Sequence, residues 1–265
     1  MLAAIGLSIF AGLSTGIGGL IVMLFKKVNA KVLSVALGFS AGVMIYVSFV
    51  EILPDAKKYL IKGAGTQAGE WLAFGAFFFG MFLIAIIDKL VPKQENPHEP
   101  HNVEQFDACG FGQNSQKLIK TGKLAAIAIT IHNFPEGMAT FISGINDTSL
   151  GIAIAVAVAI HNIPEGISVA LPIYCATGNR KKAFYMSLLS GLAEPAGAIL
   201  AFFIFAPFIN DVVFGIIYGS VAGIMVFISL DELLPSAREY GEHHSAIFGL
   251  IGGMIIMGLS LLILL

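Results

Sequence analysis

Charge is scarce in this 265-residue sequence, since only 12% of the residues are Asp, Glu, Lys or Arg, against roughly 25% in a typical soluble domain. There are two cysteines and one tryptophan. Two cysteines do not make a disulfide framework. The net charge is −2 and no basic cluster occurs, so nothing indicates a nucleic-acid partner. These absences exclude an ordinary water-exposed domain, a disulfide-stapled one and a nucleic-acid-binding protein.

Apolar residues dominate instead, at 57% of the chain with a mean hydropathy of +0.86. The sequence therefore predicts an integral membrane protein that lies in the lipid bilayer. Runs of about 20 apolar residues are typical of membrane-spanning helices. Eight such runs occur, at about 2–25, 34–54, 71–91, 123–145, 150–175, 183–206, 212–235 and 246–265. The first has no basic residues before it and is expected to be a retained helix, not a signal peptide. We expect a single transmembrane domain over residues 1–265, with one polar loop at about 92–122.

The distribution of basic residues predicts the orientation. With eight spans, one membrane face receives 12 of the 15 Lys and Arg residues, and the opposite face receives only Lys57, Lys58 and Lys62. Basic loops usually lie in the cytoplasm. The polar loop is then cytoplasmic and both termini point outward.

Two segments repeat at a constant offset of 181 residues: GFSAGVMIYVSFVEILPDAKKY (38–59) and GSVAGIMVFISLDELLPSAREY (219–240). The second and seventh spans therefore resemble each other, and the first resembles the sixth more weakly. Partners of this kind cross the membrane in opposite directions. The sequence predicts an all-α fold of eight helices in a 3+2+3 arrangement with inverted repeats, which is typical of secondary transporters.

The fourth and fifth spans carry a second duplication, IHNFPEG (131–137) and IHNIPEG (160–166). On a helix, the His, Asn and Glu of each copy share one sector. Pro135 and Pro164 cannot bond the carbonyls four residues earlier, so we expect each helix to kink or open there. The sixth span adds Glu194, also followed by a proline.

These residues are costly in a bilayer, at about 2.5–3.5 kcal/mol for each charged side chain near its centre. No Lys or Arg lies in the core of these three spans. Either the carboxyl groups are protonated or a cation supplies the missing charge. Imidazole, carboxylate and amide groups together suit a divalent ion, Zn²⁺ above all. The chemistry alone leaves metal and proton open.

The duplicated HNxPEG motif, the glutamate of the sixth span and the eight spans resemble the ZIP (ZRT/IRT-like) metal transporters, in particular their bacterial zinc-uptake subgroup. The resemblance covers essentially the whole chain. It implies uptake of Zn²⁺, with Fe²⁺, Mn²⁺, Co²⁺ or Cd²⁺ as further substrates, across the cell inner membrane into the cytoplasm. It also implies a two-metal site bridged by two of its glutamates, Glu136 and Glu165. The implied ligands are His132, Asn133, Glu136, His161, Asn162, Glu165 and Glu194.

Two other functions stay open at this point. An intramembrane metal-dependent hydrolase would need a substrate opening and a general base, and the HExxH motif is absent. A proton conductor would explain the acids and histidines but not the paired asparagines. We expect no enzymatic activity and no prosthetic group, and the sequence leaves a homodimer open. His98 and His101 of the polar loop fit an ordinary loop better than a metal sensor. Glycine pairs with GxxxG spacing predict close helix packing.

Overall fold

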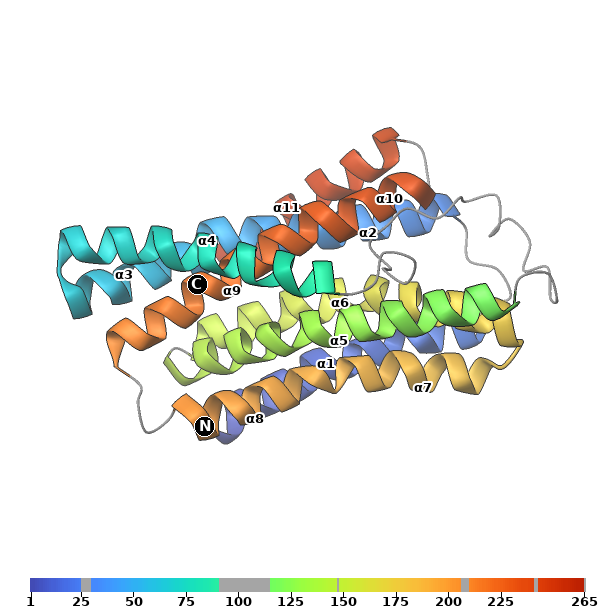
Figure 1. Ribbon diagram of the computed structural model, residues 1–265, viewed down its shortest axis with the longest axis horizontal. Helices are drawn as coiled ribbons and strands as arrows, with labels where there is room; N and C mark the ends of the chain where they lie inside the picture. The colour runs from blue at the N-terminus through green and yellow to red at the C-terminus, as the bar shows by residue number, and fades with distance from the viewer. Residues whose placement is uncertain (25–29, 91–114, 147, 206–209, 241–242, 265) are drawn as a thin grey trace.

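The computed structural model describes residues 1–24, 30–90, 115–146, 148–205, 210–240 and 243–264 (Figure 1). Over these ranges the regular structure is entirely helical, as predicted for an all-α membrane protein. The α-helices are α1 (Leu2–Leu24), α2 (Ala30–Val47), α3 (Leu53–Ala64), α4 (Thr66–Leu90), α5 (Ser115–Asn146), α6 (Thr148–Thr177), α7 (Arg180–Gly191), α8 (Ala193–Phe205), α9 (Asp211–Ile228), α10 (Leu234–Tyr240) and α11 (His243–Leu264).

Seven stretches of the described residues are long and apolar enough to cross a membrane. They are Leu2–Leu24, Ser34–Ala64, Thr66–Ile87, Thr148–Thr177, Arg180–Phe203, Asp211–Arg238 and His244–Ile263. These coincide with seven of the eight predicted spans. The eighth prediction, 123–145, falls inside α5, which has 32 residues but is not among the seven.

Helix α5 begins at Ser115, well before the expected start at residue 123. The predicted loop therefore ends earlier than residue 122. Its first part, including His98 and His101, lies outside the described residues. The difference has a simple cause, since Lys and Gln are good helix formers and a polar stretch can extend a spanning helix into water. The sequence prediction followed hydropathy alone and therefore placed the helix start too late.

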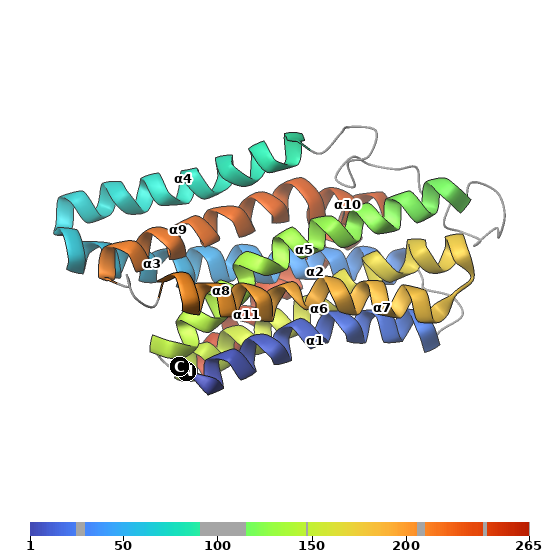
Figure 2. The same cartoon turned by 60° about the horizontal axis from the view of Figure 1, so that its bottom comes forward.

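The helices pack as two groups (Figure 1). One group, here called the α1 bundle, contains α1, α5, α6, α7 and α8. The other, the α2 bundle, contains α2, α3, α4, α9, α10 and α11. The bundles meet mainly where α2 crosses α6, with further contacts of α6 to α11 and of α5 to α9. The turned view in Figure 2 shows the start of α1 and the end of α11 at the same end of the molecule.

The two segments of the 181-residue repeat have the same local structure. A π-helical turn, Ser48–Ile52, joins α2 to α3, and a second one, Ser229–Leu233, joins α9 to α10 at the same offset. Each turn is followed by a proline, Pro54 or Pro235, within the next helix. A proline has no N–H to bond the carbonyl four residues earlier, so the backbone hydrogen-bond pattern of the helix must change there. The pair α2–α3 runs in the opposite direction to the pair α9–α10 (Figures 1 and 2).

The prolines of the duplicated motif lie inside continuous helices. Helices α5 and α6 continue without interruption through Pro135 and Pro164, so of the two predicted effects, a kink or an opening, the opening does not occur. Both prolines lie within long helices, since α5 has 32 residues and α6 has 30. The interruption occurs instead in the sixth span, at Leu192 between α7 and α8. Pro195 cannot bond the Gly191 carbonyl, and this breaks the helix next to Glu194.

Glycines bring α2 and α11 together, as the GxxxG spacing predicted. A Cβ atom added at Gly38 or Gly42 would overlap the carbonyl oxygen of Ala246 or Leu250 on α11. Added at Gly249 or Gly253, it would overlap the backbone of α2. The backbones therefore touch from both sides, which fixes α2 within its bundle.

Candidate metal centre

The duplicated motif places three titratable side chains in one buried cluster. Glu136 comes from α5, and His161 and Glu165 come from successive turns of α6. Each offers one ligand atom, and these atoms all lie within 4.8 Å of one another. The three side chains are at most 1% exposed. We call this group the acidic cluster. Such a group has the composition and spacing of a divalent-cation site.

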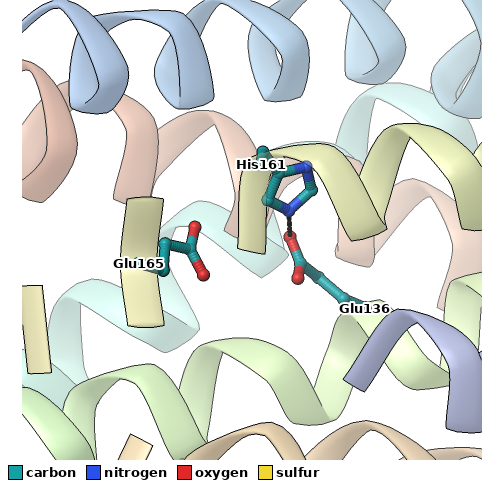
Figure 3. Close-up of side chains that lie close together, drawn as sticks. All are labelled: Glu136, His161 and Glu165. Atoms are coloured by element: carbon teal, nitrogen blue, oxygen red, sulfur yellow. Dashed lines mark hydrogen bonds and ion pairs between the residues drawn. The ribbon is translucent and has the colours of Figure 1, made fainter. Parts of the chain in front are cut away.

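The closest contact in the acidic cluster joins the two motif copies. Nε2 of His161 lies 3.1 Å from Oε1 of Glu136, a hydrogen-bonding distance (Figure 3). Figure 3 also shows the carboxylates of Glu136 and Glu165 turned toward the same space beside the imidazole ring. One nitrogen and two carboxylates thus converge from two helices. All three groups bind a metal ion in their deprotonated form.

A fourth polar side chain reaches the acidic cluster from the α2 bundle. Ser40 of α2 is fully buried, and its Oγ donates to Oε1 of Glu165 at 3.3 Å. The same Oγ lies 3.3 Å from the carbonyl oxygen of His161. Sequence reasoning missed Ser40, because neither copy of the HNxPEG motif contains it. Its partner in the 181-residue repeat is Val221, so the repeat gives no signal for a hydroxyl there either.

The two asparagines of the motif make hydrogen bonds to α1, α7 and α8. Asn162 donates through Nδ2 to the carbonyl of Ala11 at 3.1 Å and to the carboxylate of Glu194. Asn133 donates to the carbonyl of Ser190 at 3.3 Å. Asn133, Asn162 and Glu194 are all fully buried. Among the described atoms, Oδ1 of each asparagine is buried without a hydrogen-bond partner.

The structure thus brings six of the seven predicted ligand residues into one region of α5, α6 and α8. Three of them form the acidic cluster, and Asn162 and Glu194 form a hydrogen-bonded pair next to it. Asn133 turns its amide nitrogen toward α7. The seventh residue, His132, belongs to α5, but its side chain lies outside the described part of the structure.

The glycine that ends each motif copy allows the neighbouring helix to approach. A Cβ atom added at Gly137 would overlap the backbone oxygen of Glu194 on α8. Added at Gly166, it would overlap the backbone oxygen of Thr15 on α1. The motif therefore specifies close packing as well as ligands. The contact at Gly137 places the backbone of Glu194 against α5, the helix that bears Glu136.

Apolar side chains enclose the acidic cluster on one side. A small cavity touches Glu136 and His161, and its other walls are Val43, Val47, Ile52, Ala139, Ile154, Ala157, Val158 and Met225. Charged groups in such surroundings interact strongly because little water screens them. The site can therefore offset the cost of burying two carboxylates by binding a cation.

Comparison with known proteins gives the family. The sequence matches the family described as ZIP Zinc transporter over residues 1–117 and 93–261. The zinc transporter ZupT of Streptococcus mutans is 60% identical over 257 residues, which are 97% of this chain and 96% of that protein. The zinc transporter ZupT of Lysinibacillus sphaericus is 58% identical over 264 residues, covering 100% of this chain and 98% of the relative. That of Chlorobium chlorochromatii is 55% identical over 263 residues, with 99% and 98% covered. A likeness of this extent shows that the chain belongs to the ZIP zinc transporter family, whose members are transporters and not enzymes.

Proposed function

We propose that this protein carries Zn²⁺ across the cell inner membrane into the cytoplasm, and that the ion binds at the acidic cluster. The observation that carries the proposal is the convergence of Glu136, His161 and Glu165 from both copies of the motif. They are fully buried in helices of membrane-spanning length. The relatives named as zinc transporters support the choice of ion.

The transport site has two adjacent cation positions in this proposal. Glu136 and Glu165 bridge them, His132 and His161 supply nitrogen, and Asn133, Asn162 and Glu194 supply oxygen. The buried Oδ1 atoms of the asparagines support this assignment, because an amide oxygen without a hydrogen-bond donor is a ready ligand. The hydrogen bond from Asn162 supports it for Glu194, since it joins that carboxylate to the residue that follows His161.

The whole chain forms one transport domain of eight spans, in which α5 supplies the fourth. The 3+2+3 arrangement is supported by the matching π-helical turns, which lie on helix pairs that run in opposite directions. The ion moves when the α1 bundle and the α2 bundle rock against each other, so that the site opens to alternate sides. The acidic cluster lies where the bundles meet, which is the position that this mechanism needs.

Both termini face outward in this orientation. Their position at one end of the molecule agrees with an even number of crossings (Figure 2). At that end, Lys57, Lys58 and Lys62 each pair with a carboxylate: Glu70, Asp55 and Asp211, respectively. These ion pairs cancel the positive charge of the outward face and leave the basic excess on the cytoplasmic one.

Fe²⁺, Mn²⁺, Co²⁺ and Cd²⁺ are further substrates under this proposal. A mixed imidazole and carboxylate site accepts several first-row divalent ions and ranks them by its geometry and the softness of its ligands. The proposal includes a homodimer as a state to be tested by mass measurement in detergent.

The test is uptake of ⁶⁵Zn²⁺ into proteoliposomes that contain the full-length protein. Glu165→Ala should abolish uptake, whereas Glu70→Ala, at an exposed ion pair, should leave it near the wild-type level. Unlabelled Fe²⁺, Mn²⁺, Co²⁺ and Cd²⁺ then rank the ions by competition. Equal uptake by wild type and Glu165→Ala would show that the acidic cluster is not the transport site. An inactive wild type would show that the ion or the direction is wrong.

A further inference from the structure

Ser40 contacts the acidic cluster from the opposite bundle. Helix α2, which carries it, is held in the α2 bundle by its close packing on α11. The hydroxyl has one hydrogen, and the two oxygens that lie 3.3 Å from it, on the Glu165 carboxylate and the His161 carbonyl, both belong to α6 in the α1 bundle. The hydroxyl therefore crosses the interface between the bundles and ends on a proposed metal ligand.

Many hydroxyls of the described helices bond differently. Ser220 and Ser260 each donate to the carbonyl four residues earlier in their own helix, at 2.8 and 2.9 Å. That is the ordinary arrangement for a serine inside a helix. Ser40 instead makes its hydrogen bonds to α6. Its rotamer is therefore set by the neighbouring bundle and not by its own helix.

The surroundings of Ser40 on α2 are apolar. Val43 and Val47 line the small cavity beside the acidic cluster. In the other direction along α2, Ala36 and Phe39 line an apolar groove against α6. A hydrogen bond to a carboxylate in such surroundings is electrostatically stronger than in water.

This hydrogen bond orients Glu165 without blocking it. An ionised carboxylate has two oxygens with about four lone-pair directions, so the hydrogen bond from Ser40 does not by itself prevent cation binding. The bond restricts rotation of the carboxylate and keeps it facing Glu136 and His161. A ligand held in its bound orientation binds more tightly because less freedom is lost on binding.

We propose that Ser40 is a positioning residue of the transport site: its hydroxyl holds the Glu165 carboxylate in the orientation that binds Zn²⁺. The inference rests on the proposed function, since it assumes that Glu165 is a ligand. It adds a contribution of the α2 bundle to a site whose ligands all come from the α1 bundle. When the bundles rock apart, Glu165 loses this support, and the affinity of the site for the ion falls.

The test measures initial rates of ⁶⁵Zn²⁺ uptake into proteoliposomes over a range of zinc concentrations. Ser40→Ala should raise KM roughly tenfold and leave the maximal rate little changed, because support of a ligating carboxylate acts on ion affinity. Equilibrium zinc titration of the purified, folded variant should show the same loss of affinity.

Two matched controls separate positioning from packing. Ser34→Ala removes a buried hydroxyl from the same helix, one that donates to the Ala237 carbonyl at 2.6 Å within the α2 bundle. Tyr218→Phe removes another hydroxyl contact between the bundles, the 2.6 Å hydrogen bond between Tyr218 and Ser143, away from the acidic cluster. Both controls should keep the wild-type KM.

Three results would overturn the inference. The first is a KM for Ser40→Ala no higher than that for Ser34→Ala, and the second is a lower maximal rate with KM unchanged. The third is an equal rise in KM for Tyr218→Phe, which would assign the effect to contact between the bundles in general. A wild type that does not transport zinc would instead refute the proposed function. Transport by the wild type with an unaltered Ser40→Ala would refute only the role of Ser40.

Discussion

Nε2 of His161 and Oε1 of Glu136 lie 3.1 Å apart, so a proton shared by these two atoms joins the two copies of the duplicated motif. In the proposed site, the same two atoms are ligands of the divalent ion. Binding of the ion and retention of the proton therefore exclude each other at this contact.

The first prediction concerns pH. Because protons compete with Zn²⁺ for His161 and Glu136, uptake should weaken as the outside solution becomes more acidic. Initial rates of ⁶⁵Zn²⁺ uptake into proteoliposomes, measured at a fixed low zinc concentration and at several outside pH values, check this. A rate that stays flat across the mildly acidic and neutral range would contradict it.

The second prediction concerns ion preference. His161→Asn replaces the imidazole nitrogen with an amide oxygen at a buried position. Nitrogen ligands favour Zn²⁺ over Mn²⁺, whereas oxygen ligands suit Mn²⁺. The ratio of zinc to manganese affinity should therefore fall by roughly tenfold. Competition titrations of the purified variant measure it, with Ser34→Ala as the control. An unchanged ratio would remove His161 from the proposed ligand set.

The third prediction concerns the second cation position. Asn162→Ala removes the hydrogen bond to Glu194 and one proposed oxygen ligand. The number of zinc ions bound per chain should drop from two toward one, as measured by elemental analysis after equilibrium dialysis. Ser187→Ala is the matched control, since it removes a buried contact to the Thr15 carbonyl without touching these residues. If both variants bind as much zinc as the wild type, Asn162 is not a ligand.

The fourth prediction concerns packing at the motif glycines. Gly137→Ala and Gly166→Ala each place a Cβ atom onto the backbone of a neighbouring helix. Such overpacking typically costs about 1–3 kcal/mol, so the unfolding temperature in detergent should fall for both variants. Gly75→Ala is the control, because nothing lies within 4 Å of a Cβ atom added there. An equal shift for all three variants would show that the contacts at Gly137 and Gly166 are not specific.

Much of this arrangement was predictable from the sequence, because the bilayer imposes strong rules. A run of about 20 apolar residues has few alternatives to a helix in lipid. Charged side chains such as those of Glu136 and Glu165 are rare in membrane-spanning helices, so their presence predicted a cation site. The structure buries both of them next to His161. The repeat at 38–59 and 219–240 was visible because identical residues recur in register.

The parts that escaped prediction depend on contacts between segments far apart in the chain. Ser40 reaches Glu165 only because α2 packs across α6, and one serine in an apolar helix carries no signal of that. The prolines also differ in their effect on the helix. Pro164 lies in an uninterrupted helix, whereas Pro195 follows a break at Leu192. Hydrophobic pattern and spacing do not distinguish these two cases.

The π-helical turns let the two parts of one continuous spanning segment pack against different helices. A π-helical turn is an α-helix with one extra residue, and one residue corresponds to about 100° of helical phase. Across Ser48–Ile52, the side of the helix that contacts neighbouring helices is therefore rotated about the helix axis. Before the turn, α2 presents Gly38 and Gly42 to α11, and beyond it, α3 packs on α4 and α9. Deleting one residue from the turn would restore a regular helix but rotate α3 away from these partners, so the length of the turn sets the angular registry of the α2 bundle.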